Sequence, residues 1–167
     1  KFLTGNTSKS ITQTLSYSFG NPSSIHSQGR KAKSIIENTR KSIAKELGAE
    51  SKEIIFTSGG TEGDNMILQG AVHGLGIETI ITSKIEHHAV LHSVENLEKK
   101  AAVTVQYVKV LPDGFPDIDD LERLLQNDNT KKLVSLIHVN NELGTIIDLE
   151  TIGTVSYTHL TLPTRRF

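Results

Sequence analysis

The sequence contains no cysteine, and this absence limits its chemistry before any motif is considered. Without thiols the 167 residues form no disulfide and no thiolate metal site, and they supply no cysteine nucleophile. Neither charge sign dominates: 18 Lys and Arg stand against 19 Asp and Glu, and the formal net charge of -1 disfavours a basic surface for nucleic acid. No apolar run reaches the length of a membrane span and no signal segment opens the chain, so we expect neither a membrane nor a nucleic-acid partner.

Methionine is nearly absent too, because Met66 is the only one and the chain begins at Lys1. These two features predict that the sequence is a piece of a longer protein. The remaining composition is ordinary for a folded domain, since 36% of the residues are hydrophobic and 22% are charged. Such proportions can build a core, and the length suits one domain rather than two.

Segments with a helical period alternate along the chain with short apolar runs. The clearest helix is predicted over residues 28–47, where Ile35, Ile36 and Ile43 recur on one face and Gly48 follows as a stop. Further helices are predicted over residues 61–73, 87–100 and 117–126. Strands are predicted over residues 53–57, 79–82, 103–110 and 133–139. The alternation predicts an α/β fold with a mostly parallel sheet flanked by helices.

The two ends of the chain depart from this alternation. Residues 1–20 carry scattered apolar positions without a sustained period, which suits a helix remnant or an extended lead-in. Residues 154–167 have no helical period and continue no earlier pattern, so we interpret them as a non-native or unstructured tail.

The turn after the first predicted strand, Thr57-Ser58-Gly59-Gly60-Thr61-Glu62, has the composition of a phosphate cradle. Glycine lets the backbone approach a ligand, and the free N–H groups of a helix start can bind phosphate together with the Thr61 hydroxyl. An ordinary helix cap is the alternative, with Thr61 capping its own helix and Asp64 completing the pair. Walker-type and dinucleotide-binding loops are excluded, because neither Gly-Lys-Ser/Thr nor the three-glycine spacing is present.

A second turn, Ile85-Glu86-His87-His88, follows the strand predicted over residues 79–82. An imidazole at this position can stack on a planar ligand and exchange protons near neutral pH. His88 and His92 are four residues apart, a spacing that allows metal ligation on one helix face, although no clear third ligand lies nearby. The alternative is that these histidines are simply exposed in a first helical turn.

A third turn, His138-Val139-Asn140-Asn141-Glu142, follows the last predicted strand. A carboxamide at a strand end can donate to an oxygen on a ligand ring, and an ordinary polar turn is the alternative. Open α/β sheets bind ligands at the carboxyl ends of their strands, so the three turns are candidates for one site.

In this order and at these separations, the three turns and the segment Gly20-Asn21-Pro22-Ser23-Ser24-Ile25-His26 resemble the cofactor half of the NifS-like cysteine desulfurases. Those enzymes belong to the class V aminotransferase group of fold type I and use pyridoxal 5'-phosphate (PLP). The resemblance runs from about Ser18 to Gly153, and it implies that residues 21–153 are the PLP-binding portion of the large domain and residues 1–20 a partial N-terminal segment.

The resemblance also implies roles for four residues. Gly60 and Thr61 would hold the cofactor phosphate. His87 would stack on the pyridine ring and assist proton transfer as a catalytic residue. Asn141 would donate a hydrogen bond to the phenolic oxygen of the ring.

The implied reaction takes sulfur from L-cysteine, releases L-alanine and leaves a persulfide on an enzyme cysteine, for iron–sulfur cluster or thio-cofactor assembly. The family's Schiff-base lysine and nucleophilic cysteine are missing from these residues, and Lys84 lies in the wrong place in the order to supply the first. Covalent catalysis is therefore not expected from this chain by itself. For the full-length protein the resemblance implies a homodimer, a sulfur-acceptor protein as partner and a cytoplasmic location.

Three alternatives remain open at this point. One is a non-catalytic α/β module that binds a phosphate-bearing ligand through Gly59 to Thr61. Another is a different class V enzyme, such as selenocysteine lyase. The third is that the sequence is an assembly artefact with no independent role. A sheet interrupted after residue 139 would also leave an unpaired edge, so we expect the 167-residue chain to aggregate.

Overall fold

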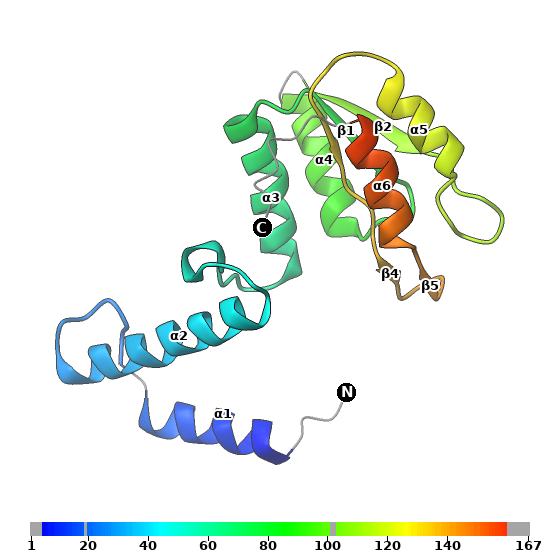
Figure 1. Cartoon of the computed structure of the whole chain (residues 1–167). Coiled ribbons are helices and arrows are strands. Elements are labelled where there is room, and N and C mark those ends of the chain that lie inside the picture. Colours follow the sequence, from blue (N-terminus) through cyan, green and yellow to red (C-terminus); the bar gives the residue numbers. More distant parts are fainter. Residues whose placement is uncertain (1–4, 19, 101–102, 160–167) are drawn as a thin grey trace. The chain divides into compact units, whose positions relative to one another are not determined.

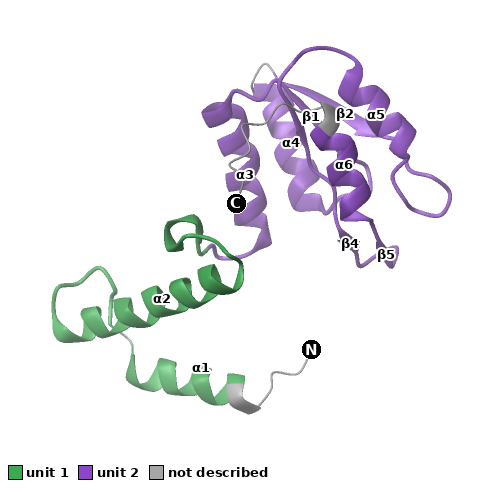
Figure 2. Cartoon of the chain, viewed as in Figure 1, with its two compact units in different colours: residues 1–56 green, residues 57–167 purple. Residues whose placement is uncertain are grey.

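The structure, a computed structural model, describes residues 5–18, 20–100 and 103–159. The chain divides into two compact units, Lys1–Phe56 and Thr57–Phe167, which Figure 2 distinguishes by colour. Within the described residues, unit 1 is helical and unit 2 contains all of the strands.

Unit 1 consists of helix α1 (Gly5–Tyr17), helix α2 (Ser27–Glu46) and the short 3₁₀ helix η1 (Ser51–Glu53) (Figure 1). Helix α2 begins where His26 caps it, because the imidazole Nδ1 accepts a hydrogen bond from the Gly29 N–H at 3.2 Å. Gly48 follows the helix with a φ of 63°, a left-handed conformation that glycine adopts at low cost. The helix predicted over residues 28–47 is confirmed.

Two glycines allow the turn before α2 to close tightly. A Cβ atom on Gly29 would lie 2.4 Å from the Ser24 carbonyl oxygen and 2.6 Å from that of Asn21. A Cβ atom on Gly20 would lie 2.4 Å from the Gln28 carbonyl oxygen. No larger residue fits at either position, and the chain therefore folds back against the first turn of α2.

The strand predicted over residues 53–57 is wrong. In the described part of the chain these residues pair with no strand, and only their first residue is regular, as the end of η1. Instead, the Arg40 guanidinium on α2 donates a hydrogen bond to the Ile54 carbonyl oxygen and lies 4.9 Å from the centroid of the Phe56 ring. The apolar run packs along α2, because a strand forms only where a neighbouring strand can satisfy its backbone.

Unit 2 is an α/β arrangement around a three-stranded sheet (Figure 1). In chain order its elements are α3 (Gly60–Leu75), β1 (Thr79–Ser83), α4 (His88–Lys100), β2 (Thr104–Val108), α5 (Ile118–Gln126), β3 (Lys132–Val134), β4 (Val139–Asn140), β5 (Thr145–Ile146) and α6 (Leu149–His159). The sheet has the order β2-β1-β3, and β1 pairs in parallel with both neighbours. Strands β4 and β5 form a separate antiparallel pair. The predicted α/β fold with a mostly parallel sheet is confirmed.

Helices cover both faces of this sheet, and each face has its own apolar cluster. Ile80 of β1 packs with residues of α3 and α4, among them Leu68 and Val94. Ile81, the next residue of β1, packs on the opposite face with residues of α5 and α6, among them Leu121 and Ile152. Consecutive residues of a strand point to opposite faces, so the fully buried strand β1 serves both clusters.

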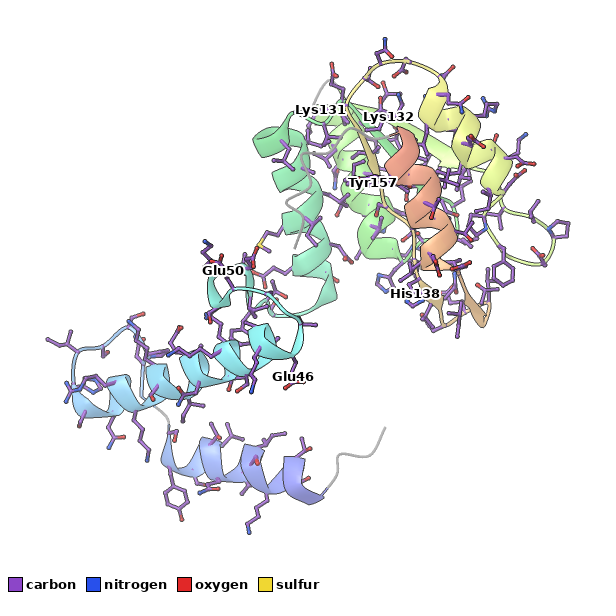
Figure 3. All side chains as sticks on the ribbon, viewed as in Figure 1. Glu46, Glu50, Lys131, Lys132, His138 and Tyr157 are labelled. Carbon is purple, nitrogen blue, oxygen red and sulfur yellow. The ribbon has the colours of Figure 1, made fainter. Side chains whose placement is uncertain are left out.

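The first residue of β3 buries a charge. The Lys132 side chain is buried, and its Nζ donates to the carbonyl oxygen and to a carboxylate oxygen of Asp128, each at 2.6 Å. This hydrogen bond lowers the pKa of Asp128 to about 2. Figure 3 shows Lys132 next to Lys131, whose Nζ donates to the Leu75 carbonyl oxygen at 2.9 Å. The start of β3 is therefore connected to the loop before it and to the end of α3.

Two further segments differ from the expectation. Of the strand predicted over residues 133–139, only the beginning is in the sheet, as β3, and the chain then leaves it and pairs again in β4. Residues 154–159, expected to be part of an irregular tail, are helical within α6, where Val155 packs against the core. The rest of that tail, residues 160–167, lies outside the described residues, and the suggestion that the tail is non-native stays a prediction.

None of the helices in the described ranges combines the length and the hydropathy that crossing a membrane requires.

Candidate functional site

Helix α3 begins at the first candidate turn with its N-terminal donors uncapped. Its N-cap residue is Gly59, no side chain caps it, and the first helical hydrogen bond runs from the Gly63 N–H to the Gly59 carbonyl oxygen at 3.1 Å. The N–H groups of Gly60, Thr61 and Glu62 precede that bond and belong to the unpaired donors of a helix start. A Cβ atom added at Gly59 or Gly60 would meet nothing within 4 Å, so no described segment packs against these two glycines at that position.

Thr61 is not the cap of its own helix, and the capping alternative for this residue is therefore wrong. It lies inside α3 and is exposed, and its carbonyl oxygen accepts from the Asn65 Nδ2 at 2.8 Å. Within the described residues, its hydroxyl has no hydrogen-bond partner. The neighbouring Glu62 carboxylate accepts from the Ser58 N–H at 2.5 Å, which lowers the pKa of Glu62. The turn is thus shaped by Glu62, and the Thr61 hydroxyl is available to a ligand.

The second candidate turn links β1 to α4 and carries His87. The Ser83 hydroxyl oxygen accepts from the Ile85 N–H at 3.3 Å, which helps to close the turn. His87 is exposed and directly precedes α4, and its Nδ1 accepts from the Ala89 N–H at 3.1 Å. Because Nδ1 is an acceptor, the neutral ring carries its proton on Nε2 and can donate from that atom.

The third candidate turn connects β4 to β5, and its two asparagines differ in role. Asn140 is buried: its Nδ2 donates to the Ile85 carbonyl oxygen at 2.8 Å, and its Oδ1 accepts from the N–H groups of Glu142 and Leu143 at 2.9 and 3.0 Å. Asn141 is exposed, and in the part of the chain that the structure describes its side chain has no partner. Asn140 therefore shapes the turn, and Asn141 is the asparagine that can meet a ligand.

The second and third turns are joined to each other. Strands β1 and β3 are parallel neighbours, so their carboxyl ends lie at the same edge of the sheet. Two hydrogen bonds connect the segments that follow them: the Asn140 amide donates to the Ile85 carbonyl oxygen, and the Ile137 N–H donates to the Glu86 carboxylate. The two turns form one hydrogen-bonded unit.

The start of α3 reaches the same region. The Ser93 hydroxyl of α4 donates to Asn65 Oδ1 of α3 at 2.8 Å, close to the candidate phosphate cradle in sequence. The carboxylate of Asp64, one residue earlier, acts electrostatically on Glu86 in the second turn. The first turns of α3 and the two joined turns therefore meet around Glu86.

Glu86 is a buried carboxyl group at this meeting point, with 8% of its surface exposed. Burial raises the pKa of Glu86 to about 7, against the effect of the hydrogen bond from Ile137 and with a contribution from the charge of Asp64. Perturbed carboxyl groups of this kind cluster at functional sites.

Sequence reasoning singled out neither Glu86 nor Asn140, although both connect the turns. Glutamate is seldom fully buried, so nothing in its type indicates burial. The one available signal was its place between a predicted strand and His87. For Asn140 the signal was weaker still, because two adjacent asparagines in a turn cannot be told apart without the burial of each.

The histidines of α4 form no metal centre with other groups in the described ranges. The rings of His88 and His92 are stacked, with centroids 5.8 Å apart and an interplanar angle of 20°. Nowhere in those ranges do three His, Asp or Glu side chains gather in a way that could hold a metal ion.

Comparisons with known proteins match most of the chain. The family described as aminotransferase class-V matches residues 4–160. The cysteine desulfurase IscS of Dictyoglomus turgidum is 46% identical over 144 residues, which cover 85% of this chain and 36% of that protein. Among solved structures, a NifS-like protein superposes with a TM-score of 0.85 and 32% identity, over 95% of this chain and 43% of its own. The structure named SspA in complex with cysteine superposes with a TM-score of 0.80 and 32% identity, over 94% of this chain and 45% of its own. The chain thus spans less than half the length of these relatives.

Proposed function

The chain belongs to the class-V aminotransferase family, and from that premise we propose that the whole protein is a PLP-dependent cysteine desulfurase. It would remove sulfur from L-cysteine and release L-alanine, and pass the sulfur on from an enzyme persulfide. The names of the relatives and the neighbour that holds cysteine support this reaction. The single observation that carries it is the hydrogen-bonded unit of the His87 and Asn141 turns.

The donors of the three turns fit PLP by their chemistry. An uncapped helix N-terminus with a hydroxyl that has no partner in the described residues suits a phosphate group. An exposed imidazole with a fixed tautomer suits the face of an aromatic ring, and an exposed carboxamide suits a ring oxygen. When bound, PLP supplies an electron sink for bond breaking at the amino acid.

Each of these residues would have a distinct task. The N–H of Gly60 and the hydroxyl of Thr61 would bind the phosphate, and the partial positive charge of the α3 start would favour its negative charge. His87 would stack on the ring and donate a proton from Nε2, because the Ala89 N–H occupies Nδ1. Asn141 would donate from its amide to the phenolic oxygen and hold the ring in one orientation.

The thiol of the proposed reaction has to come from outside these residues, since the 167 residues contain no cysteine. We therefore expect the isolated 167-residue chain, supplied with PLP and L-cysteine, to form neither alanine nor sulfide. Release of alanine from this chain alone would contradict that expectation.

The test of the proposed function uses the full-length protein. With PLP, L-cysteine and a thiol reductant such as dithiothreitol, which reduces the enzyme persulfide and is itself oxidised to a disulfide, it should release alanine and sulfide in equal amounts. Thr61→Ala, His87→Ala and Asn141→Ala should each weaken PLP binding or lower turnover, by about tenfold or more where a hydrogen bond to a charged group is lost. Absorbance titration of the PLP-free protein measures binding, and alanine formation measures turnover.

His73→Ala is the matched control for His87→Ala. His73 is an exposed histidine in the last turn of α3, outside the three candidate turns, and its Nε2 lies 3.1 Å from the Gln69 Oε1. This variant should behave as the wild type. A folded full-length protein that forms no alanine from L-cysteine would defeat the proposal, and exclusive activity on L-selenocysteine would replace it with a selenocysteine lyase.

For the whole protein we also propose a homodimer, a sulfur-acceptor protein as partner and a cytoplasmic location. The family relationship supports these three points, and size-exclusion chromatography of the full-length protein tests the first.

A further inference from the structure

We propose that Glu86 is a positioning residue whose buried carboxylate ties the turn that carries His87 to the segment that leads to Asn141. The tie sets the spacing of the imidazole and the carboxamide at the edge of the sheet. The expected effect of Glu86 on cofactor binding rests on the proposed function. The hydrogen bond between the two segments is a property of this chain itself.

The geometry places Glu86 between two segments that are 51 residues apart in the chain. Its carboxylate accepts the hydrogen bond from the Ile137 N–H, just after β3 has left the sheet. The second connection, from the Asn140 amide to the Ile85 carbonyl oxygen, lies next to the first. Two adjacent hydrogen bonds restrict both the translation and the rotation of one segment relative to the other. A single hydrogen bond would not restrict both.

The surroundings of Glu86 are mostly uncharged. It shares a small cavity with uncharged residues from the ends of β1, β3 and β5 and from the segment before α5: Ser83, Ile85, Pro116, Leu136, Ile137, Thr145 and Ile147. Asp64 is the charged group that acts on it from α3. The other titratable groups of the joined turns are all exposed: Lys84, His87, His88, His138 and Glu142.

If this position served packing alone, an uncharged side chain would cost less free energy, because burying a carboxylate among uncharged groups is unfavourable. A carboxyl group still offers the Ile137 N–H an acceptor, which an apolar side chain cannot do. Burial raises the pKa of Glu86 to about 7, so the closed arrangement favours the neutral carboxyl group, and this group ionises across neutral pH. Opening of the tie returns the ionised carboxylate to water, so the tie should be weaker at pH 8 than at pH 6.

The experiment compares full-length wild type with Glu86→Gln, which keeps the shape and a neutral acceptor, and with Glu86→Ala, which removes the acceptor. Glu95→Gln is the control, because Glu95 is an exposed acid on α4 whose carboxylate lies 4.0 Å from the His92 imidazole. Hydrogen–deuterium exchange of the PLP-free protein is followed in peptides covering residues 135–141 and 118–126.

At pH 8 the amides of residues 135–141 should exchange about tenfold more slowly in Glu86→Gln than in wild type, because glutamine stays neutral when buried, while at pH 6 the two should agree. Glu86→Ala should exchange faster at both values, and the peptide of α5 should be unchanged in all variants. Glu95→Gln should match wild type throughout. Equal exchange of wild type and Glu86→Gln at pH 8, or a uniform increase over the whole unit, would overturn the proposal.

PLP titration of the same proteins separates this inference from the proposed function. We expect the PLP dissociation constant of Glu86→Gln to lie below that of wild type at pH 8 but not at pH 6. If wild type binds no PLP, the proposed function fails, and the exchange result still decides on the tie. If wild type binds PLP and the PLP dissociation constant depends on pH in the same way in Glu86→Gln, the positioning role is overturned.

Discussion

Individual buried polar side chains, rather than the apolar core, hold the candidate site of this protein in shape. Glu86 and Asn140 connect segments that are more than fifty residues apart in sequence, and both are buried. Such groups are costly to leave unpaired, so their removal should have effects that surface substitutions do not have.

Glu86→Gln should change how stability depends on pH. The pKa of Glu86 is raised from its ordinary value of 4.5 to about 7, so between these values the folded state binds more protons than the unfolded state. The contribution to stability is complete below the unfolded pKa and is lost as the pH rises through 7, by at most about 3 kcal/mol. Glutamine does not ionise, and this part of the pH dependence should disappear.

Urea unfolding of the full-length protein at about pH 5 and about pH 8 measures this difference between wild type and variant. Glu95→Gln should keep the wild-type dependence, because Glu95 is exposed on α4. Equal slopes of stability against pH in wild type and Glu86→Gln would contradict the expectation.

The two neighbouring asparagines provide a second comparison. Asn140→Ala removes three hydrogen bonds at a buried position and should lower the free energy of unfolding by about 2–3 kcal/mol. Asn141→Ala removes no contact within the described residues, so its effect on stability should stay within about 0.5 kcal/mol while PLP binding weakens. Chemical unfolding and PLP titration of both variants distinguish the two roles. A large loss of stability in Asn141→Ala with none in Asn140→Ala would contradict this assignment.

At the scale of elements, the turn before α2 depends on close backbone contact. Gly29→Ala would place a Cβ atom 2.4 Å from the Ser24 carbonyl oxygen, which either breaks the turn or unwinds the first turn of α2. A loss of about 1–3 kcal/mol is expected. Gly70→Ala is the control within α3, where a Cβ would meet nothing within 4 Å, and it should stabilise by up to about 1 kcal/mol.

Thermal unfolding followed by circular dichroism measures both glycine variants. A Gly29→Ala protein as stable as wild type would show that the turn is not closed in the way described.

Elements with a continuous period were predictable, and elements that depend on a partner were not. Helix α2 shows its apolar face directly in sequence, so its bounds followed within a residue. The apolar run at Ile54 and Phe56 has the composition of a strand, but it contacts Arg40 of α2 instead of another strand. The segment after β3 was also predicted as strand to residue 139, although Ile137 bonds to the Glu86 side chain rather than to a neighbouring strand.

At the scale of the whole molecule, the sheet has open edges. In the described residues β2 and β3 each pair only with β1, and several large apolar side chains are exposed, including Leu15 and Ile25 in unit 1. Unpaired strand edges and exposed apolar groups favour association, so the 167-residue chain expressed alone should form soluble oligomers or aggregates.

Size-exclusion chromatography with light scattering measures this association, and the full-length protein serves as the comparison. A monodisperse monomer of the 167-residue chain at high concentration would contradict it.

Part of the candidate site followed from the sequence, and part did not. The residue types and their order along the chain determined that a glycine-rich helix start, an imidazole and a carboxamide each follow a short apolar run, because hydropathy and turn chemistry are local properties. Only the tertiary structure decided that Glu86 is buried, that Asn140 rather than Asn141 holds the turn, and that residues 54–57 form no strand. Burial and pairing depend on what distant segments bring to the same place, and no local pattern of residues contains that information.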